Sequence, residues 1–146
     1  MQQLHTRLAL ILIAISTALL GFSMALMGHH RHITLITDFY GITPLLSGSI
    51  YNFIAAFSFI AVAVIACLSI KHARFRPLLG YSLIILSVIP LLALFGQSMW
   101  IDSLGGFPAI GSGQGVIKYF ALLSIGFLLI EINLSTKTKQ WLSVIP

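Results

Sequence analysis

Acidic side chains are almost absent from this sequence, and charged residues of either sign are scarce. Its 146 residues include three Asp or Glu, and charged residues make up 8% of the chain, against roughly 25% in soluble domains. Hydrophobic residues reach 58% and the mean hydropathy is +1.04. A water-soluble fold of this length cannot bury so much apolar surface. The composition therefore predicts an integral membrane protein, which the lipid bilayer solvates directly.

Cysteine is limited to Cys67, which stands inside an apolar run. A single cysteine excludes an internal disulfide and a CxxC redox pair, so we interpret Cys67 as a small packing residue. The net charge of +5 comes from Lys and Arg in short connections, as the positive-inside rule describes for membrane proteins. We therefore expect the bilayer as a partner and no nucleic acid.

Long uncharged runs account for most of the chain. Each is about long enough to cross ~30 Å of hydrocarbon as a helix, and they cover residues 8–27, 50–70, 78–99 and 116–132. We predict an all-α fold: one domain over residues 1–146, an integral membrane four-helix transmembrane bundle. Ser23-Met24-Ala25 has the pattern of a signal-peptide cleavage site, but the apolar run is longer than a typical signal core. We expect an uncleaved helix.

The cations divide unevenly between the two sides of such a bundle. Two of the eight Lys and Arg residues, Arg31 and Lys118, fall in or beside the first and third loops. The other six lie at the N-terminus, in the second connection and in the tail: Arg7, Lys71, Arg74, Arg76, Lys137 and Lys139. The positive-inside rule then places both termini in the cytoplasm.

Small and polar residues interrupt the apolar spans. Small residues recur on one face of the first span, where another helix can approach closely: Ala14, Ala18, Gly21 and Ala25. Asn52, near the outer end of the second span, can hydrogen-bond to another helix or to a loop. Pro90 removes a backbone donor in the third span, so we expect a kink there, with Ser87 as a candidate partner for the freed carbonyl.

Residues 29–49 form the first predicted loop, in which Pro44 and the Gly and Ser residues argue against a continuous helix. Ile33–Ile36 is apolar enough to lie in the membrane interface. Three imidazoles open this loop and are weak candidates for zinc or copper ligands: His29, His30 and His32. Because no second ligand cluster follows, we interpret them as interfacial polar residues and predict no metal site.

The stretch from Trp100 to Lys118, WIDSLGGFPAIGSGQGVIK, is unlike the rest of the chain. It lacks the Gly-Lys-Ser/Thr of a Walker loop and the preceding strand of a dinucleotide site. We predict an ordered, glycine-rich outer loop before the last helix. The loop either caps the outer end of the bundle, or it forms a binding site in which the N-terminus of the last helix binds an anion or the headgroup of a lipid or quinone. The candidate ligand-binding residues are Trp100, Asp102, Gly113, Gly115 and Lys118.

Two charges inside the last span require partners. Lys118 lies near the helix N-terminus, where a cation opposes the helix dipole; it snorkels, pairs with Asp102 or Asp38, or contacts a ligand. Glu131 lies near the C-terminus, where an anion is equally disfavoured. We predict a structural ion pair between Glu131 and a cation of the second connection or the N-terminus: Arg74, Arg76, Lys71 or Arg7.

The order of these features resembles a known family. A polar loop contains Ile42-Thr43-Pro44, and the third loop contains Gly106-Phe107-Pro108 and Ser112-Gly113-x-Gly115 before a Lys. The chain resembles the DoxX-like group of small four-helix proteins of the bacterial inner membrane, in particular its YkgB branch. The resemblance implies a role in redox or oxidative-stress physiology, some relatives being subunits beside quinone-reactive enzymes.

Three functions stay open. The first is binding of a quinone or lipid-like ligand beneath the glycine-rich loop. The second is a non-catalytic accessory subunit that packs against a larger membrane complex, or a second copy, through its small-residue seam. The third is a small oligomeric transporter, which we rank last because polar residues in the spans are few: Asn52, Ser58, Ser87, Gln97 and Ser124. No catalytic triad is recognisable, so we expect no independent catalytic activity.

Overall fold

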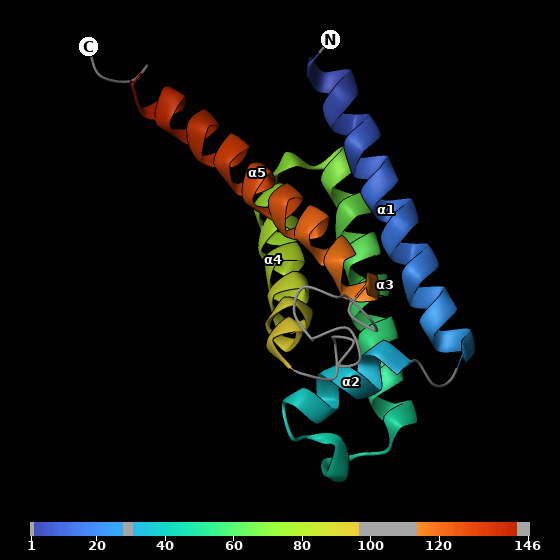
Figure 1. Ribbon diagram of the computed structural model, residues 1–146. Helices are drawn as coiled ribbons and strands as arrows, with labels where there is room; N and C mark the ends of the chain where they lie inside the picture. The colour runs from blue at the N-terminus through green and yellow to red at the C-terminus, as the bar shows by residue number, and fades with distance from the viewer. Residues whose placement is uncertain (1, 28–30, 97–113, 143–146) are drawn as a thin grey trace.

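Helices form every regular element in the described part of the chain. The computed structural model describes residues 2–27, 31–96 and 114–142, with side chains for residues 4–27, 33–96 and 116–131. The five α-helices are α1 (Gln2–Met27), α2 (Arg31–Phe39), α3 (Gly48–Lys71), α4 (Arg76–Leu92) and α5 (Gln114–Leu142). Short 3₁₀ helices are η1 (Thr43–Leu45), η2 (Ala73–Phe75) and η3 (Ala93–Phe95). The all-α prediction is confirmed (Figure 1).

Three of these helical segments are long and apolar enough to cross a membrane: Leu4–Met27, Gly48–Lys71 and Ala73–Phe95. Only 33% of the most apolar window of each is buried inside the protein. The remaining apolar side chains face outward, where water would be a poor solvent and hydrocarbon a good one. The first three predicted spans thus correspond to helices, and the fourth, residues 116–132, falls within α5, where a crossing remains a prediction.

The helices pair along the chain. α1 packs most extensively on α3, and α4 on α5, while α3 and α4 share a smaller contact. Figure 1 shows α1 beside α3, and α5 crossing α4 obliquely before its C-terminal end runs beyond the other helices. α5 continues as a helix to Leu142, well past the end of the predicted span. The bundle therefore consists of two helix pairs in contact.

α1 and α3 meet at Gly21. A Cβ atom on Gly21 would lie 2.7 Å from Ile60 Cγ1 and 2.9 Å from the Ala56 carbonyl oxygen, both tighter than van der Waals contact. Ala14 is buried on the same face. The small-residue seam therefore does bring a helix into close approach, as predicted, and α3 already occupies it.

A second glycine crossing joins α4 to α5. A Cβ on Gly126 would lie 2.8 Å from Ile84 Cγ1 and 2.9 Å from the Gly80 carbonyl oxygen, and one on Gly80 would lie 2.8 Å from the Gly126 carbonyl oxygen. The two backbones thus touch with no side chain between them. Our sequence analysis did not single out this pair, because each glycine stands alone in its own span.

α4 ends two residues after Pro90 and continues as η3. Ser87 does not bond the Leu86 carbonyl, which is the one that proline frees; its hydroxyl donates instead to the Leu83 carbonyl, at 2.6 Å. The suggested role of Ser87 is therefore wrong. The reason is local: a serine hydroxyl in a helix reaches the carbonyl four residues back, and for Ser87 that is Leu83.

The first loop is also shorter than predicted, because Arg31–Phe39 forms α2. Ile33 and Ile36 lie three residues apart, on one helical face, and both are buried. Pro44, which argued against a continuous helix, falls in η1 beyond the end of α2. The burial of two isoleucines against the bundle thus stabilises a helix that is too short to be stable alone.

Two buried clusters fill the interior. The cluster at the α2 end joins side chains of α1, α2, α3, η3 and α5: Met24, Ile33, Ile36, Ala56, Phe59, Ala93, Val116 and Tyr119. The cluster at the other end joins α1, α3, α4 and α5: Leu10, Ile13, Ala14, Val62, Ala66, Leu79, Leu83 and Leu129. Each end of the bundle thus has its own apolar core, on which its polar groups are positioned.

Gly126→Val tests the α4–α5 crossing. Its side chain would clash with the Gly80 backbone, so we expect a loss of about 1–3 kcal/mol in the free energy of unfolding, read as a lower thermal midpoint in detergent. Ala121→Val is the matched control, because Ala121 lies on the exposed face of the same helix. Equal midpoints for the two variants would contradict the crossing.

Candidate functional site

Asn52 is the most deeply buried polar group at the α2 end. It has no exposed surface, and its Nδ2 donates to the backbone carbonyl of Met24 on α1. The predicted bond from Asn52 to another helix is therefore confirmed. The Oδ1 atom is buried and has no hydrogen-bond partner. A buried acceptor left unpaired costs about 1–3 kcal/mol.

The surroundings of Asn52 are apolar and come from several elements. Ala56, one helical turn along α3, belongs to the core cluster that Val116 and Tyr119 join from α5. The rings of Phe59 and Tyr119 lie 6.2 Å apart between centroids. The unpaired Oδ1 thus lies among apolar side chains. A hydrogen-bond donor that reached this oxygen would compete with little water for it.

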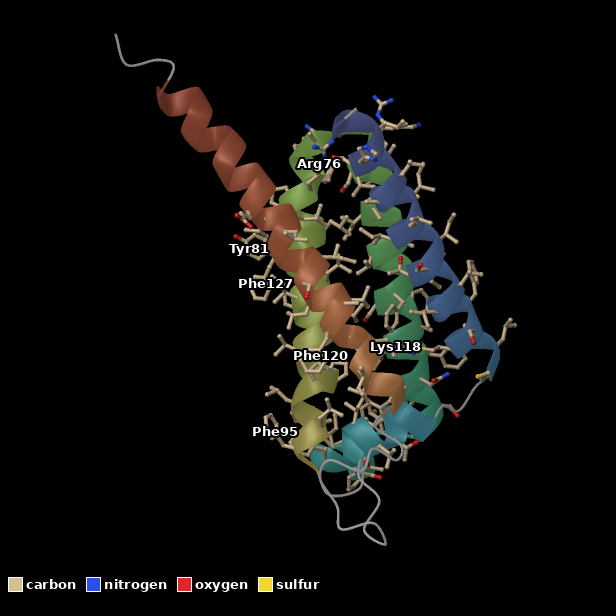
Figure 2. The ribbon with its side chains drawn as sticks, turned by 45° about the horizontal axis from the view of Figure 1, so that its top comes forward. Arg76, Tyr81, Phe95, Lys118, Phe120 and Phe127 are labelled. Atoms are coloured by element: carbon tan, nitrogen blue, oxygen red, sulfur yellow. The ribbon has the colours of Figure 1, made fainter. Side chains whose placement is uncertain are left out.

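Lys118 stands next to this cluster on α5. Its side chain is exposed, and its Nζ lies 5.8 Å from the centroid of the Tyr119 ring, a cation–π contact worth about 0.5–1 kcal/mol at an exposed site. Figure 2 places Lys118 in the half of the bundle nearer to α2, with Arg76 at the opposite end. Among the described residues no ion pair joins Lys118 to a carboxylate, and Asp38 accepts from the Thr43 hydroxyl.

Most of the other predicted ligand residues cannot be placed around Asn52. Trp100, Asp102, Gly113, His29 and His30 lie outside the described residues. Gly115 lies in the first turn of α5, and His32 lies in α2, where its side chain is outside the description. Among the residues that are described, no group of His, Cys, Asp or Glu has the arrangement of a metal site.

Hydrogen bonds from two tyrosines brace the α2 end. Tyr51 on α3 donates to the Ile42 carbonyl. Tyr40, just after α2, donates to the Ile89 carbonyl on α4 at 2.8 Å. The Ile89 carbonyl is free to accept this bond. In a continuous α-helix it would accept from the Ala93 N–H, but here that N–H bonds the Pro90 and Leu91 carbonyls at the start of η3. Desolvation raises the pKa of the Tyr40 phenol above its ordinary value, which favours the protonated hydroxyl that donates this bond. Neither tyrosine bond is readable from sequence spacing.

The opposite end carries the basic connection. The Arg74 guanidinium lies 5.0 Å from the Phe75 ring centroid. Arg76 is partly buried, and its Nε has no hydrogen-bond partner. Within the described side chains no ion pair joins Glu131 to Arg74 or Arg76, so that pair stays a prediction.

The comparisons with known proteins identify no relative: no family model, no curated protein and no solved structure matches this chain.

Tyr40→Phe tests the tie between α2 and α4. Removing the hydroxyl leaves the Ile89 carbonyl without its donor, and we expect the free energy of unfolding to fall by about 0.5–1.5 kcal/mol, measured by thermal or denaturant unfolding. Tyr81→Phe is the matched control, because Tyr81 is exposed and its hydroxyl makes no hydrogen bond to the described residues. A loss as large in the control would contradict a specific role for Tyr40.

Proposed function

We propose that this protein is a DoxX-like, four-span membrane protein that binds an amphipathic hydroxyl-bearing molecule at the α2 end of the bundle. The observation that carries the proposal is the buried, unpaired Oδ1 of Asn52. In this proposal Asn52 accepts a hydrogen bond from the hydroxyl of a quinol-like or lipid-like ligand. Lys118, at the same end, attracts the more electronegative part of its headgroup.

The chemistry of these residues favours binding over catalysis. Asn52 has no titratable group, and its Nδ2 is engaged by the Met24 carbonyl, so the amide is fixed and acts as an acceptor. The side chains of the cluster around it are apolar, as are most of those that line sites for rings or acyl chains. A redox role, which the family resemblance implies, would then belong to the bound molecule, and the protein would hold and orient it.

An accessory subunit is the second candidate, and the course of α5 favours it. The C-terminal end of α5 extends beyond the other helices (Figure 1), where a partner subunit or a second copy can pack. The seam of small residues on α1 is a poorer docking surface than predicted, because α3 covers Gly21. A partner would therefore contact α5.

A transporter is less well supported by the described polar groups. Ser58, Ser87 and Ser124 each donate to the carbonyl four residues earlier in their own helix. Their hydroxyls are thus satisfied locally, and Ser124 is exposed on the outside of the bundle. Gln97 lies outside the described residues. The described serines therefore offer a transported polar molecule few free groups.

Ligand retention tests the proposed site. We expect the purified wild-type protein to retain a hydroxylated amphiphile that mass spectrometry of its organic extract identifies. Asn52→Leu and Lys118→Ala should each lower the retained amount by about tenfold, the equivalent of 1.4 kcal/mol. Ser124→Ala is the control, since it removes an exposed hydroxyl from the same helix as Lys118. Retention unchanged in both site variants, or no amphiphile at all in the wild type, would overturn the proposal.

The four-span topology has its own test. With both termini cytoplasmic, a reporter fused after Arg76 should be active only on the cytoplasmic side, because that position follows the second span. A reporter fused after Tyr40 should behave as an external position. Periplasmic activity of the Arg76 fusion would contradict the proposed orientation.

A further inference from the structure

The end of the bundle opposite α2 carries positive charge with little to balance it. Leu10, Ala66 and Leu79 pack in one buried cluster. On α1, Arg7 lies three residues before Leu10, and on α4, Arg76 lies three residues before Leu79. On α3, Lys71 lies five residues after Ala66. Figure 2 shows nitrogen atoms gathered at this end, around Arg76. We call this surface, with Arg74, the basic collar.

Few acids are available to neutralise the basic collar. The sequence has three acidic residues. Asp38 lies at the α2 end, bonded to Thr43, and Asp102 is outside the described residues. Glu131 remains, with no ion pair to Arg74 or Arg76 among the described side chains. A counter-ion from outside the chain is therefore expected at this end.

Arg76 differs from the other cations of the collar. Arg7, Lys71 and Arg74 are exposed, whereas Arg76 is partly buried, and its Nε is buried without an acceptor. Leaving such a donor unpaired is costly. A planar guanidinium pairs best with an oxyanion that takes two of its N–H groups at once.

The position of the collar along the bundle indicates which oxyanion is at hand. The membrane-crossing segment Ala73–Phe95 begins within the collar, so Arg74 and Arg76 stand at headgroup depth. The Arg74 guanidinium lies over the Phe75 ring, 5.0 Å from its centroid. Basic surfaces between helices at this depth bind the headgroups of anionic lipids.

We propose that Arg76, Lys71 and Arg74 of the basic collar bind the phosphate of an anionic phospholipid, with the Arg76 guanidinium as the main ligand and with Arg7 outside this site. The site is separate from the α2 end and does not depend on the function proposed there. It selects lipids by net negative charge as well as by the phosphate group, because a zwitterionic headgroup brings its own cation.

Native mass spectrometry of the detergent-solubilised protein tests this proposal. With equimolar phosphatidylglycerol and phosphatidylcholine of the same acyl chains, we expect wild-type protein to retain phosphatidylglycerol about fivefold or more in excess. Arg76→Gln should remove most of that preference. Arg7→Gln, which removes the same charge from an exposed position of the collar, should leave it within about twofold.

Further arms decide the chemistry of the site. Arg76→Lys keeps the charge but loses the planar fork, and we expect it to lose preference as well; full retention would overturn the role of Nε. Millimolar inorganic phosphate should not displace the lipid, and displacement would mean a general anion site. If Arg76→Gln and Arg7→Gln lose the same share of the preference for phosphatidylglycerol, the preference comes from the total charge of the collar and not from a specific site. If Arg76→Gln does not fold, the wild-type preference decides alone, and its absence overturns the proposal.

Discussion

In hydrocarbon, burying apolar side chains between helices gains no hydrophobic free energy, because lipid tails are as apolar as leucine. Close van der Waals contact therefore has to hold the helices together. In this protein that contact depends on glycine. Gly21 lets α1 approach the backbone of α3, and Gly80 and Gly126 let α4 and α5 touch directly. The smaller contact between α3 and α4 then joins two tight pairs.

The placement of polar groups follows from the same solvent. Hydroxyls within the bundle satisfy themselves on their own helices: Thr17 on Ile13, Ser69 on Ile65 and Ser87 on Leu83. Two groups at opposite ends are not satisfied in this way, Asn52 Oδ1 and Arg76 Nε. One lacks a donor and the other lacks an acceptor. A hydrogen-bond donor would therefore satisfy the end with Asn52, and an acceptor would satisfy the end with Arg76.

Much of this fold is predictable from sequence because length and hydropathy alone select membrane-crossing helices. The seam at Gly21 and the bond of Asn52 to another helix were also predictable, since small and polar residues inside apolar runs have few roles in lipid. α2 was not, because its stability comes from Ile33 and Ile36 packing on other helices. Nor was the Gly80–Gly126 crossing, since single glycines in two spans have no sequence signature. The candidate site was predicted only in part: Lys118 lies at the α2 end beside the cluster of Val116 and Tyr119, while Asn52 entered our sequence analysis as a hydrogen bond between helices and not as a ligand residue.

The bond from Tyr40 to Ile89 has a consequence for biogenesis. Tyr40 is synthesised with the first helix pair, and its acceptor lies in the last turns of α4, which the ribosome delivers later. Until that part of α4 has been made and folded, the Tyr40 phenol lacks this acceptor. The bond therefore forms only once the end of α4 is in place, and it then ties the segment after α2 to the end of α4.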